Sequence, residues 1–380
     1  MLPAPESACF LIADISGYTS FLAGVELDHA QDLIADLMDT VVKGLRPPFR
    51  LAKFEGDAAF VYAVTAKVDG SMLQDIIESA YFKFRRRLRD IKQASACECK
   101  ACAAMGDLDF KFVLHHGEMV KQKMGGREEL AGRDVILVHR LLKNTVSEKI
   151  GSRAYALYSD ACIQTMGIDP VAQGLVEHHE TIDIIGDVTL WLRGLEEAWQ
   201  KENEQTRVEV TRDDAYAILE FDIAAPRQAV WEYFTVPGQW QKWWPTDGII
   251  EHSDNRRRGV GTKNHCMHGK DAIIEELLDW RPFDYFTVST LLPMPGAPKV
   301  VMTRAFQDGP NGTTRLEMRI AKPKPNDAAF VDQIAPKFKE DVTNAIGSLR
   351  QILEGQTSIA VIDEPALMPS QERFLTEPVK

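Results

Sequence analysis

The spacing of hydrophobic residues in the first half of the chain predicts strands that alternate with helices. Short apolar runs beside turn residues are typical of strands, and apolar residues repeated every three or four positions are typical of amphipathic helices. We expect strands at 9–14, 50–54, 58–64, 110–115 and on both sides of Gly186 within 181–191. We expect helices at 29–45, 71–92 and 135–142, the second opened by a capping box of Ser71 and Gln74.

A different pattern follows a charged stretch without periodicity near residues 196–211. Alternating apolar residues predict strands at 216–223, 271–278, 286–290, 300–306 and 314–320, with a short helix at 227–234. A long amphipathic helix is expected at 328–353, with a kink or a split at Pro336. Several strands followed by one long helix indicate a curved sheet wrapped around that helix. The residues after 356 lack periodicity and predict a flexible tail.

These patterns predict an α+β fold in two domains, which suits a chain of 380 residues. We expect the first domain, an α/β sandwich, over residues 1–200, with helices packed on a sheet that contains antiparallel strands. A linker is expected over 201–212, a second domain over 213–355 and the tail over 356–380.

Composition and charge indicate a protein of the cytoplasm. The chain has 44 Lys and Arg against 56 Asp and Glu, and a net charge of -12 is poorly suited to coating nucleic acid. The basic cluster at 83–89 is expected to be a solvated helix face. No apolar run is long enough to span a bilayer, and the first residues lack the pattern of a signal peptide. We therefore expect a cytoplasmic protein that binds neither nucleic acid nor membrane.

The first predicted strand ends in a carboxylate, Asp14, directly before the turn residues Ser16 and Gly17. A buried, unpaired carboxylate is costly, so Asp14 needs a cation, a hydrogen-bond donor or water. Asp57 lies at the tip of the hairpin predicted at 50–64, and a hairpin beside the first strand would bring the two carboxylates together. Two such groups would hold hard divalent cations such as Mg²⁺. The alternative is structural: Asp14 caps the next segment, and Asp57 is an ordinary turn residue.

Four motifs, in order, resemble those of class III nucleotidyl cyclases, the adenylate and guanylate cyclases. Ala13-Asp-Ile-Ser-Gly-Tyr-Thr19 resembles their first metal-binding motif, and Lys53-x-x-Gly-Asp57 resembles the second. Val113-Leu-His-His-Gly117 resembles a strand that ends in His-x-Gly, and residues 132–140 resemble the helix that carries the transition-state residues. The similarity covers roughly residues 1–200 and implies a cyclase-like domain with a ferredoxin-like core.

The resemblance implies a metal site and a mode of assembly. Asp14 and Asp57 would bind two Mg²⁺ or Mn²⁺ ions, assisted by the carbonyl group of Ile15. In this family the site lies between two catalytic domains, with the metal carboxylates on one and the purine and arginine contacts on the other. One such domain per chain therefore implies a homodimer.

The resemblance also implies how a purine nucleoside triphosphate would bind. Lys53 and Glu129 would contact the purine ring. Arg140 would stabilise the charge that builds on the triphosphate as the ribose 3′-oxygen attacks the α-phosphate. The family places an Asn four residues before this Arg to orient the ribose, whereas this chain has Ile136, which cannot form that hydrogen bond.

Two functions follow from the first domain. One is an adenylate or guanylate cyclase that converts a purine nucleoside triphosphate to its cyclic monophosphate and pyrophosphate. The other is a catalytically degenerate cyclase fold that binds nucleotide or a partner. Ile136, at the position where the family has Asn, favours this second function.

A cluster of three cysteines, Cys97, Cys99 and Cys102, stands between the second helix and the fourth strand. Three thiols in one short loop suit a structural Zn²⁺ or, as an alternative, an iron–sulfur cluster. His115, His116 or Cys162 would have to supply the fourth ligand. The other interpretation is three reduced cysteines in a loop.

The second half resembles the SRPBCC or START-like helix-grip superfamily over most of residues 208–355. The resemblance lies in the strand 216–221, the Pro226-x-x-x-Val-Trp231 segment, Trp240-x-x-Trp-Trp244 and Gly259-Val-Gly261. It implies an open cup that takes a small hydrophobic ligand. Trp240, Trp243 and Trp244 are expected to be core and lip residues, whereas His265, Cys266 and His268 are candidates to line the cup. A cyclase-like domain fused to such a cup would be a signalling protein that senses a small molecule.

Overall fold

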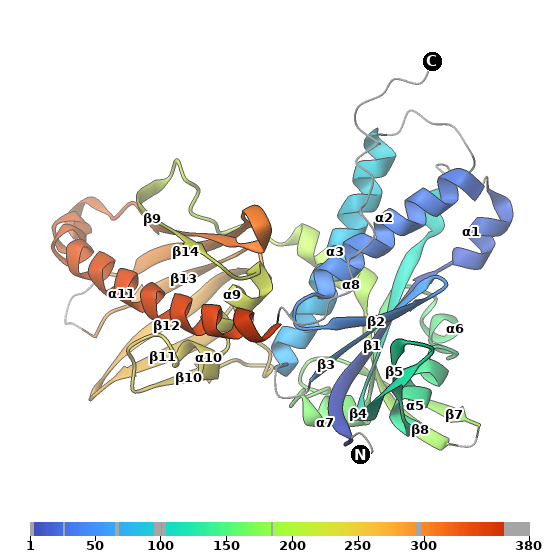
Figure 1. Ribbon diagram of the computed structural model, residues 1–380. Helices are drawn as coiled ribbons and strands as arrows, with labels where there is room; N and C mark the ends of the chain where they lie inside the picture. The colour runs from blue at the N-terminus through green and yellow to red at the C-terminus, as the bar shows by residue number, and fades with distance from the viewer. Residues whose placement is uncertain are drawn as a thin grey trace.

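The computed structural model describes residues 4–25, 27–64, 68–94, 100, 104–183, 185–293 and 298–360. Two β-sheets, each with its own helices, form two domains that lie side by side (Figure 1). None of the described helices is both long enough and apolar enough to cross a membrane.

The first domain is built on an eight-stranded sheet in the order β2-β3-β1-β4-β6-β8-β7, with β5 paired to β4. The order β2-β3-β1-β4, with the helices α1 and α2 between β1 and β2 and the helix α3 between β3 and β4, is that of a ferredoxin-like βαββαβ unit. The predicted fold class is confirmed in this domain. Its strands are β1 Glu6–Ser16, β2 Arg50–Glu55, β3 Ala58–Val64, β4 Asp109–Met124, β5 Arg127–Ala131, β6 Tyr155–Ser159, β7 Val176–Ile182 and β8 Gly186–Gly194.

Strand β1 lies in the middle of this sheet and is covered on both faces, which explains its unbroken apolar sequence. Cys9, Leu11 and Ala13 belong to the larger hydrophobic cluster, whereas Phe10 and Ile12 belong to a second cluster on the other face. The carboxylate of Asp14 therefore stands at the end of a strand with no solvated face.

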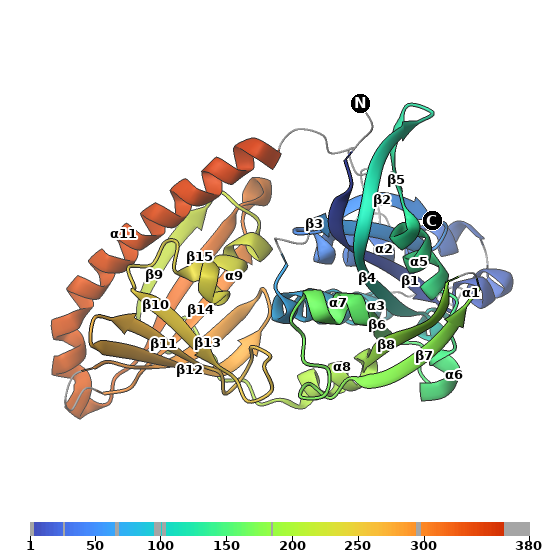
Figure 2. The same ribbon diagram turned by 90° about the horizontal axis from the view of Figure 1, so that it is seen from below.

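Helices α2 and α3 cover one face of the sheet, and α5 packs on the other (Figure 1). Strands β4 and β5 extend together as a long hairpin (Figure 2). The helical segments of this domain are α1 Tyr18–Gly24, α2 Leu27–Leu45, α3 Gly70–Ala94, η2 Met105–Asp107, α5 Arg133–Leu141, α6 Val146–Ile150, α7 Asp160–Thr165 and α8 Leu195–Glu204.

The predicted capping box at the start of α3 is wrong. Asp69, just before the helix, accepts the hydrogen bond from the backbone nitrogen of Met72 at 3.1 Å. Ser71 instead accepts a hydrogen bond from Arg258 of the second domain, and Gln74 donates to Gln173 at 2.7 Å. The two polar side chains that suggested a cap are used for tertiary contacts.

Helix α8 occupies the beginning of the segment that we expected to be a linker. It is held against α3 by an ion pair of Arg85 with Glu196 at 2.6 Å and by the ring of Trp199, whose centroid lies 5.5 Å from that of Phe82. Arg86 pairs with Glu202 at 3.5 Å. The basic cluster at 83–89 is thus partly used to bind α8, and the expectation of a wholly solvated face is wrong.

The second domain is a seven-stranded antiparallel sheet in the order β10-β11-β12-β13-β14-β15-β9, and α11 runs across it (Figure 2). The helix is continuous through Pro336, so the predicted split is not observed. Residues 361–380 of the expected tail lie outside the described residues. The elements are β9 Ala215–Ile223, α9 Arg227–Thr235, α10 Pro237–Trp240, β10 Gly248–His252, β11 Lys263–His268, β12 Asp271–Arg281, β13 Tyr285–Leu291, β14 Val300–Asp308, η3 Pro310–Gly312, β15 Thr314–Ala321, η4 Pro325–Asp327 and α11 Ala328–Ala360.

The two domains meet along the polar side of α3. Arg257, from the loop between β10 and β11, pairs with Asp75 at 3.0 Å and with Glu78 at 2.8 Å. Trp280 of β12 donates its indole hydrogen to the other oxygen of Asp75 at 3.2 Å. Burying these charges is tolerated because each has a partner of opposite sign or a hydrogen bond.

Candidate functional site

Asp14, near the end of β1, and Asp57, in the turn between β2 and β3, lie at the same end of the sheet. Asp14 pairs in register with Ala58, the residue after Asp57, and the backbone nitrogen of Ile15 donates to the carbonyl oxygen of Asp57 at 3.2 Å. Burial raises the pKa of the Asp57 carboxyl, and the charge of Asp14 raises it further. The charge of Asp14 acts on Asp57 at short range, in keeping with the strand register that sets the two residues beside each other.

Lys111 is a third charged residue at this position, and the sequence analysis did not identify it. It pairs in register with Asp14 across β4 and β1, and its ammonium nitrogen lies 2.8 Å from the Asp14 carboxylate. The side chains are 21% and 15% exposed, so the pair is largely shielded from water. A charged residue inside the apolar strand sequence Phe110-Lys-Phe-Val113 was the signal that could have identified it.

The residues at this end of the sheet fit a divalent cation that arrives with phosphate. Among the described residues, no group of three or more His, Cys, Asp or Glu side chains could hold an ion by itself. Mg²⁺, however, is commonly bound by one or two carboxylates together with substrate phosphates and water. Asp14 and Asp57 meet that requirement, whereas a site made of protein ligands alone is not present in the described part of the chain.

Lys53 and Glu129, expected to contact the purine, are close to each other. The Lys53 ammonium lies 2.9 Å from Glu55 and 3.6 Å from Glu129. The hydrogen bond to Glu55 raises the pKa of Lys53 although burial opposes this. Glu55 also accepts from His139 at 3.1 Å, which ties this cluster to α5. Neither Glu55 nor His139 is predicted from the sequence as a site residue.

Arg140 lies on α5 and lines the same groove as Lys53, Ile136 and Lys143, with a volume of ≈ 670 Å³. Ile136 lines the groove and is 56% exposed, which leaves it available to a ligand there. The lining of this groove includes neither Asp14 nor Asp57. The structure thus separates the expected site residues into two sets, Asp14 with Asp57 at the sheet end and Lys53 with Arg140 in the groove.

The His-x-Gly motif positions the helix that carries Ile136 and Arg140. His115 contacts Ser159 at 2.8 Å and Asp134 at 3.3 Å, and Asp134 accepts the backbone hydrogen of Glu118 at 2.8 Å. A β-carbon on Gly117 would lie 2.3 Å from the Asp134 side chain. Only glycine therefore lets Asp134, in the first turn of α5, reach β4.

The cysteine cluster, Cys97, Cys99 and Cys102, lies outside the described residues, and its zinc site stays a prediction. His115 and Cys162, two of the candidates for a fourth ligand, have other partners. His115 is held by Ser159 and Asp134. The hydrogen bond between Cys162 and Cys9, together with burial, raises the pKa of Cys162.

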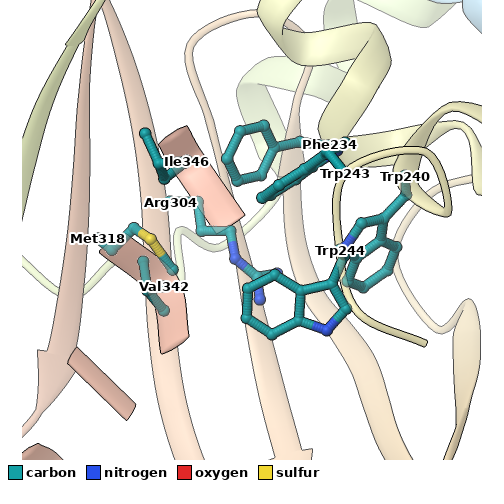
Figure 3. A pocket seen from close by; sticks show the side chains of 8 residues that line it. All are labelled: Phe234, Trp240, Trp243, Trp244, Arg304, Met318, Val342 and Ile346. Atoms are coloured by element: carbon teal, nitrogen blue, oxygen red, sulfur yellow. The ribbon is translucent and has the colours of Figure 1, made fainter. Parts of the chain in front are cut away.

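Three tryptophans of the second domain line a narrow space between the sheet and α11. Trp240, Trp243 and Trp244 surround it with Phe234, Arg304, Met318, Val342 and Ile346 (Figure 3). Its volume is ≈ 10 Å³, about the room for one water molecule. Cys266 is buried on β11, which raises its pKa to about 12, and the ring of His265 lies 4.7 Å from that of His252.

Two family models match parts of the chain. Residues 205–354 match the family described as polyketide cyclase / dehydrase and lipid transport. Residues 34–150 match the family described as a protein of unknown function, DUF2652. The chain is 42% identical over 113 residues to the uncharacterized protein Rv2561/Rv2562 of Mycobacterium tuberculosis. That similarity covers 30% of this chain and 52% of the relative, so the chain spans about half the length of the curated relative it matches.

Several solved structures are similar to one half of the chain or the other. A bacterial light-regulated adenylyl cyclase is 10% identical, with a TM-score of 0.38, and covers 50% of this chain and 52% of its own. The adenylyl cyclase CyaB from P. aeruginosa is 16% identical, with a TM-score of 0.37, and covers 50% and 95%. Protein Ms6760 from Mycobacterium smegmatis is 18% identical, with a TM-score of 0.31, and covers 39% and 96%.

The fold expected from the sequence is therefore confirmed in both halves. The first domain has the strand order and helix arrangement that the cyclase resemblance implies. The second joins a single antiparallel sheet to one long helix, and it matches the polyketide cyclase, dehydrase and lipid-transport model over nearly its whole length.

Proposed function

We propose that this protein is a nucleotidyl cyclase-like signalling protein of the cytoplasm whose second domain senses a small, largely apolar ligand. The first domain would convert a purine nucleoside triphosphate to its cyclic monophosphate and pyrophosphate. The observation that carries the proposal is the strand register that sets Asp14 beside Asp57, with the cation Lys111 paired to Asp14. Two carboxylates and an ammonium group suit a triphosphate that arrives with its metal ions.

The role of each residue follows from its charge and position. When bound, Mg²⁺ or Mn²⁺ would neutralise the triphosphate and activate the attacking oxygen. Asp14 and Asp57 would hold these ions, with the Ile15 carbonyl beside them. Lys111, displaced from Asp14 by a metal ion, would be free to donate to phosphate oxygens at the same place.

The purine would lie against Lys53 and Glu129, which offer a donor and an acceptor at 3.6 Å from each other. Arg140, exposed on α5 in the same groove, would meet the phosphates. The lining of this groove does not include the two carboxylates, which supports a site built from the carboxylates of one chain and the groove of another. We therefore propose a homodimer.

The cytoplasm suits this chemistry. The thiols of Cys9 and Cys162 are free although they are hydrogen-bonded to each other, and such neighbours persist as thiols in a reducing compartment. Arg257 and Trp280 of the second domain contact Asp75 on α3 of the first. Through these contacts, a ligand in the second domain would change how the two chains of the dimer are arranged.

The second candidate is a nucleotide-binding module without turnover, joined to a ligand carrier. It is favoured by Ile136, an exposed apolar side chain where an orienting hydrogen bond is expected. Losing one preorganised contact of this kind costs on the order of 10²-fold in rate.

The test is incubation of the purified full chain with ATP or GTP and Mn²⁺, with mass-spectrometric detection of cyclic product and pyrophosphate. Wild type should form cyclic product, and Asp57→Ala should not. If neither nucleotide gives cyclic product, the proposal of an enzyme is rejected. Calorimetric titration with each nucleotide would then show whether the first domain binds nucleotide without turnover.

A further inference from the structure

His139 joins helix α5 to strand β2 and lines the groove next to Arg140. Both nitrogens of its ring lie close to oxygen acceptors. Nδ1 is 2.7 Å from the carbonyl oxygen of Val135, and Nε2 is 3.1 Å from the carboxylate of Glu55. A neutral imidazole has only one N–H group, so the two contacts together require the doubly protonated ring. His139 is therefore a cation in this position.

Glu55 lies between two cations. The Lys53 ammonium is 2.9 Å from one of its carboxylate oxygens, and Nε2 of His139 is 3.0 Å from the other. Burial alone would raise the pKa of Glu55, but the hydrogen bond from Lys53 and the charge of His139 lower it below the ordinary value. Glu55 is thus an anion that two cations share, one from its own strand and one from α5.

The two cations differ in how firmly they are held. The ring of His139 packs edge-on against the buried ring of Phe60, with the centroids 4.7 Å apart, and its side chain is 26% exposed. The Lys53 side chain is 41% exposed and lies 3.6 Å from a second carboxylate, Glu129. Lys53 is thus the cation that can leave Glu55 for a ligand, whereas His139 stays with it.

Lys53 is also the donor expected at the purine ring, so its release from Glu55 matters for nucleotide binding. A partly buried carboxylate that loses its only cation is strongly disfavoured. Because His139 remains bound, Glu55 keeps a cation when Lys53 turns to a purine. If His139 carried no charge, the attraction of Glu55 would act on Lys53 alone and would oppose that turn.

We propose that His139 is a positioning residue for nucleotide binding: it holds Glu55, so that Lys53 is free to donate to the purine ring. His139 acts through Glu55 rather than by contact with the nucleotide. The phosphate contact expected of Arg140, the next residue of α5, is independent of Glu55. This inference deepens the proposed function and rests on it, since it assigns a role within the same groove.

The test is calorimetric titration of the full chain with two probes in the presence of Mn²⁺. One is a non-reactive α,β-methylene analogue of ATP or GTP, and the other is inorganic tripolyphosphate, which has the phosphates without a purine. His139→Gln should weaken binding of the analogue about tenfold, because the charge that offsets Glu55 is lost. Binding of tripolyphosphate should change by less than about twofold, because its contacts are independent of Glu55. A general loss of structure would instead weaken both probes.

Further variants test whether His139 acts by its charge and through Glu55. His139→Lys restores a positive charge and should return the affinity for the analogue to within about threefold of wild type. In a Glu55→Gln protein, the further change His139→Gln should alter this affinity by less than about twofold, because the carboxylate is absent. His179→Gln is the matched control and should bind both probes like wild type, since His179 is 68% exposed, pairs with Glu177 at the surface and lies outside the lining of the groove. Circular dichroism and thermal melting check that each variant is folded.

The proposal is overturned if folded His139→Gln binds the analogue as wild type does, if it weakens both probes equally, or if His139→Lys binds the analogue no better than His139→Gln. The charge-restoring variant decides where tripolyphosphate binds too weakly to be measured. A wild type that does not bind the analogue overturns the proposed function together with this inference. Binding of the analogue by wild type, with the same affinity in His139→Gln, overturns this inference alone.

Discussion

Lys111 and Asp14 face each other across β4 and β1, with the ammonium nitrogen 2.8 Å from the carboxylate oxygen. Asp57 stands next to this pair and shares the field of Asp14, which helps to raise its pKa. The ammonium group of Lys111 therefore balances only one of the two carboxylates. A net negative charge remains at this end of the sheet to attract a divalent ion. This arrangement links the geometry of the sheet end to a reaction that needs both metal and phosphate.

Restoring the missing amide at position 136 should raise cyclase activity. Ile136→Asn introduces a hydrogen-bonding group on an exposed position of the groove, where we expect the ribose to lie. We expect a gain in kcat of about tenfold or more, with the free energy of unfolding changed by less than about 0.5 kcal/mol. The matched control is Val171→Asn, at a position that is 79% exposed and away from the groove. Equal rates for the two variants would contradict the ribose role.

Gly117 should tolerate no side chain, because it admits Asp134. In Gly117→Ala the added carbon would meet the Asp134 side chain at 2.3 Å, so β4 and α5 must separate. We expect a loss of about 1–3 kcal/mol in the free energy of unfolding, measured in urea. Gly347→Ala in α11, where nothing lies within 4 Å, should instead stabilise by roughly 0.5–1 kcal/mol. A Gly117→Ala protein as stable as wild type would disprove the packing argument.

Arg257 should be essential for the contact between the domains. Arg257→Met leaves Asp75 and Glu78 buried without their shared cation, which costs about 3–5 kcal/mol. We expect earlier unfolding in denaturant and new proteolytic cleavage between the domains. The neighbour Arg256, 76% exposed and paired only at the surface with Asp169, provides the control. Arg256→Met should change stability by less than about 1 kcal/mol, and equal effects of the two substitutions would argue against a structural role of the buried pair.

The buried carboxylate Asp75 should make stability depend on pH. Burial raises its pKa to about 6 from an ordinary value of 3.8, although Arg257 opposes the shift. Because the folded pKa lies above the unfolded one, the contribution of Asp75 is fully present below pH 3.8 and is lost as the pH rises through about 6. Asp75→Asn should therefore flatten the decline in stability across this window, measured by urea unfolding at several pH values. An unchanged profile in the variant would show that Asp75 is not the group that titrates.

The sequence predicted most of the first sheet because β1 is buried on both faces and reads as an unbroken apolar run. The hairpin β2–β3 and the helices α2, α3 and α5 were also found near their observed bounds. Helix α8 was missed because its sequence is highly charged, and Glu196 and Glu202 pair with Arg85 and Arg86 beside the apolar contact of Trp199 with Phe82. Strand β6 was missed because it has only five residues and lies between short helices.

The sequence likewise predicts some residues of the candidate site and misses others. Asp14, Asp57, Lys53, Glu129 and Arg140 could be identified because motif spacing is local. Their grouping into a carboxylate end and a separate groove depends on how the strands pair. Another contact of the site needed the fold itself, because the register of β1 and β4 brings Lys111 to Asp14. Such contacts join residues far apart in sequence, and no pattern along the chain indicates them.

The most direct measurement is electron paramagnetic resonance of Mn²⁺ titrated with the full chain and a non-reactive α,β-methylene analogue of ATP or GTP. Bound Mn²⁺ loses its sharp free-ion signal, so binding is read without turnover. We predict that wild type binds Mn²⁺ with the analogue, and that Asp57→Asn weakens this binding about tenfold or more, while the exposed control Asp213→Asn does not. Equal Mn²⁺ affinity of wild type and a folded Asp57→Asn protein would contradict the claim that Asp14 and Asp57 together hold the metal ions of a nucleotide.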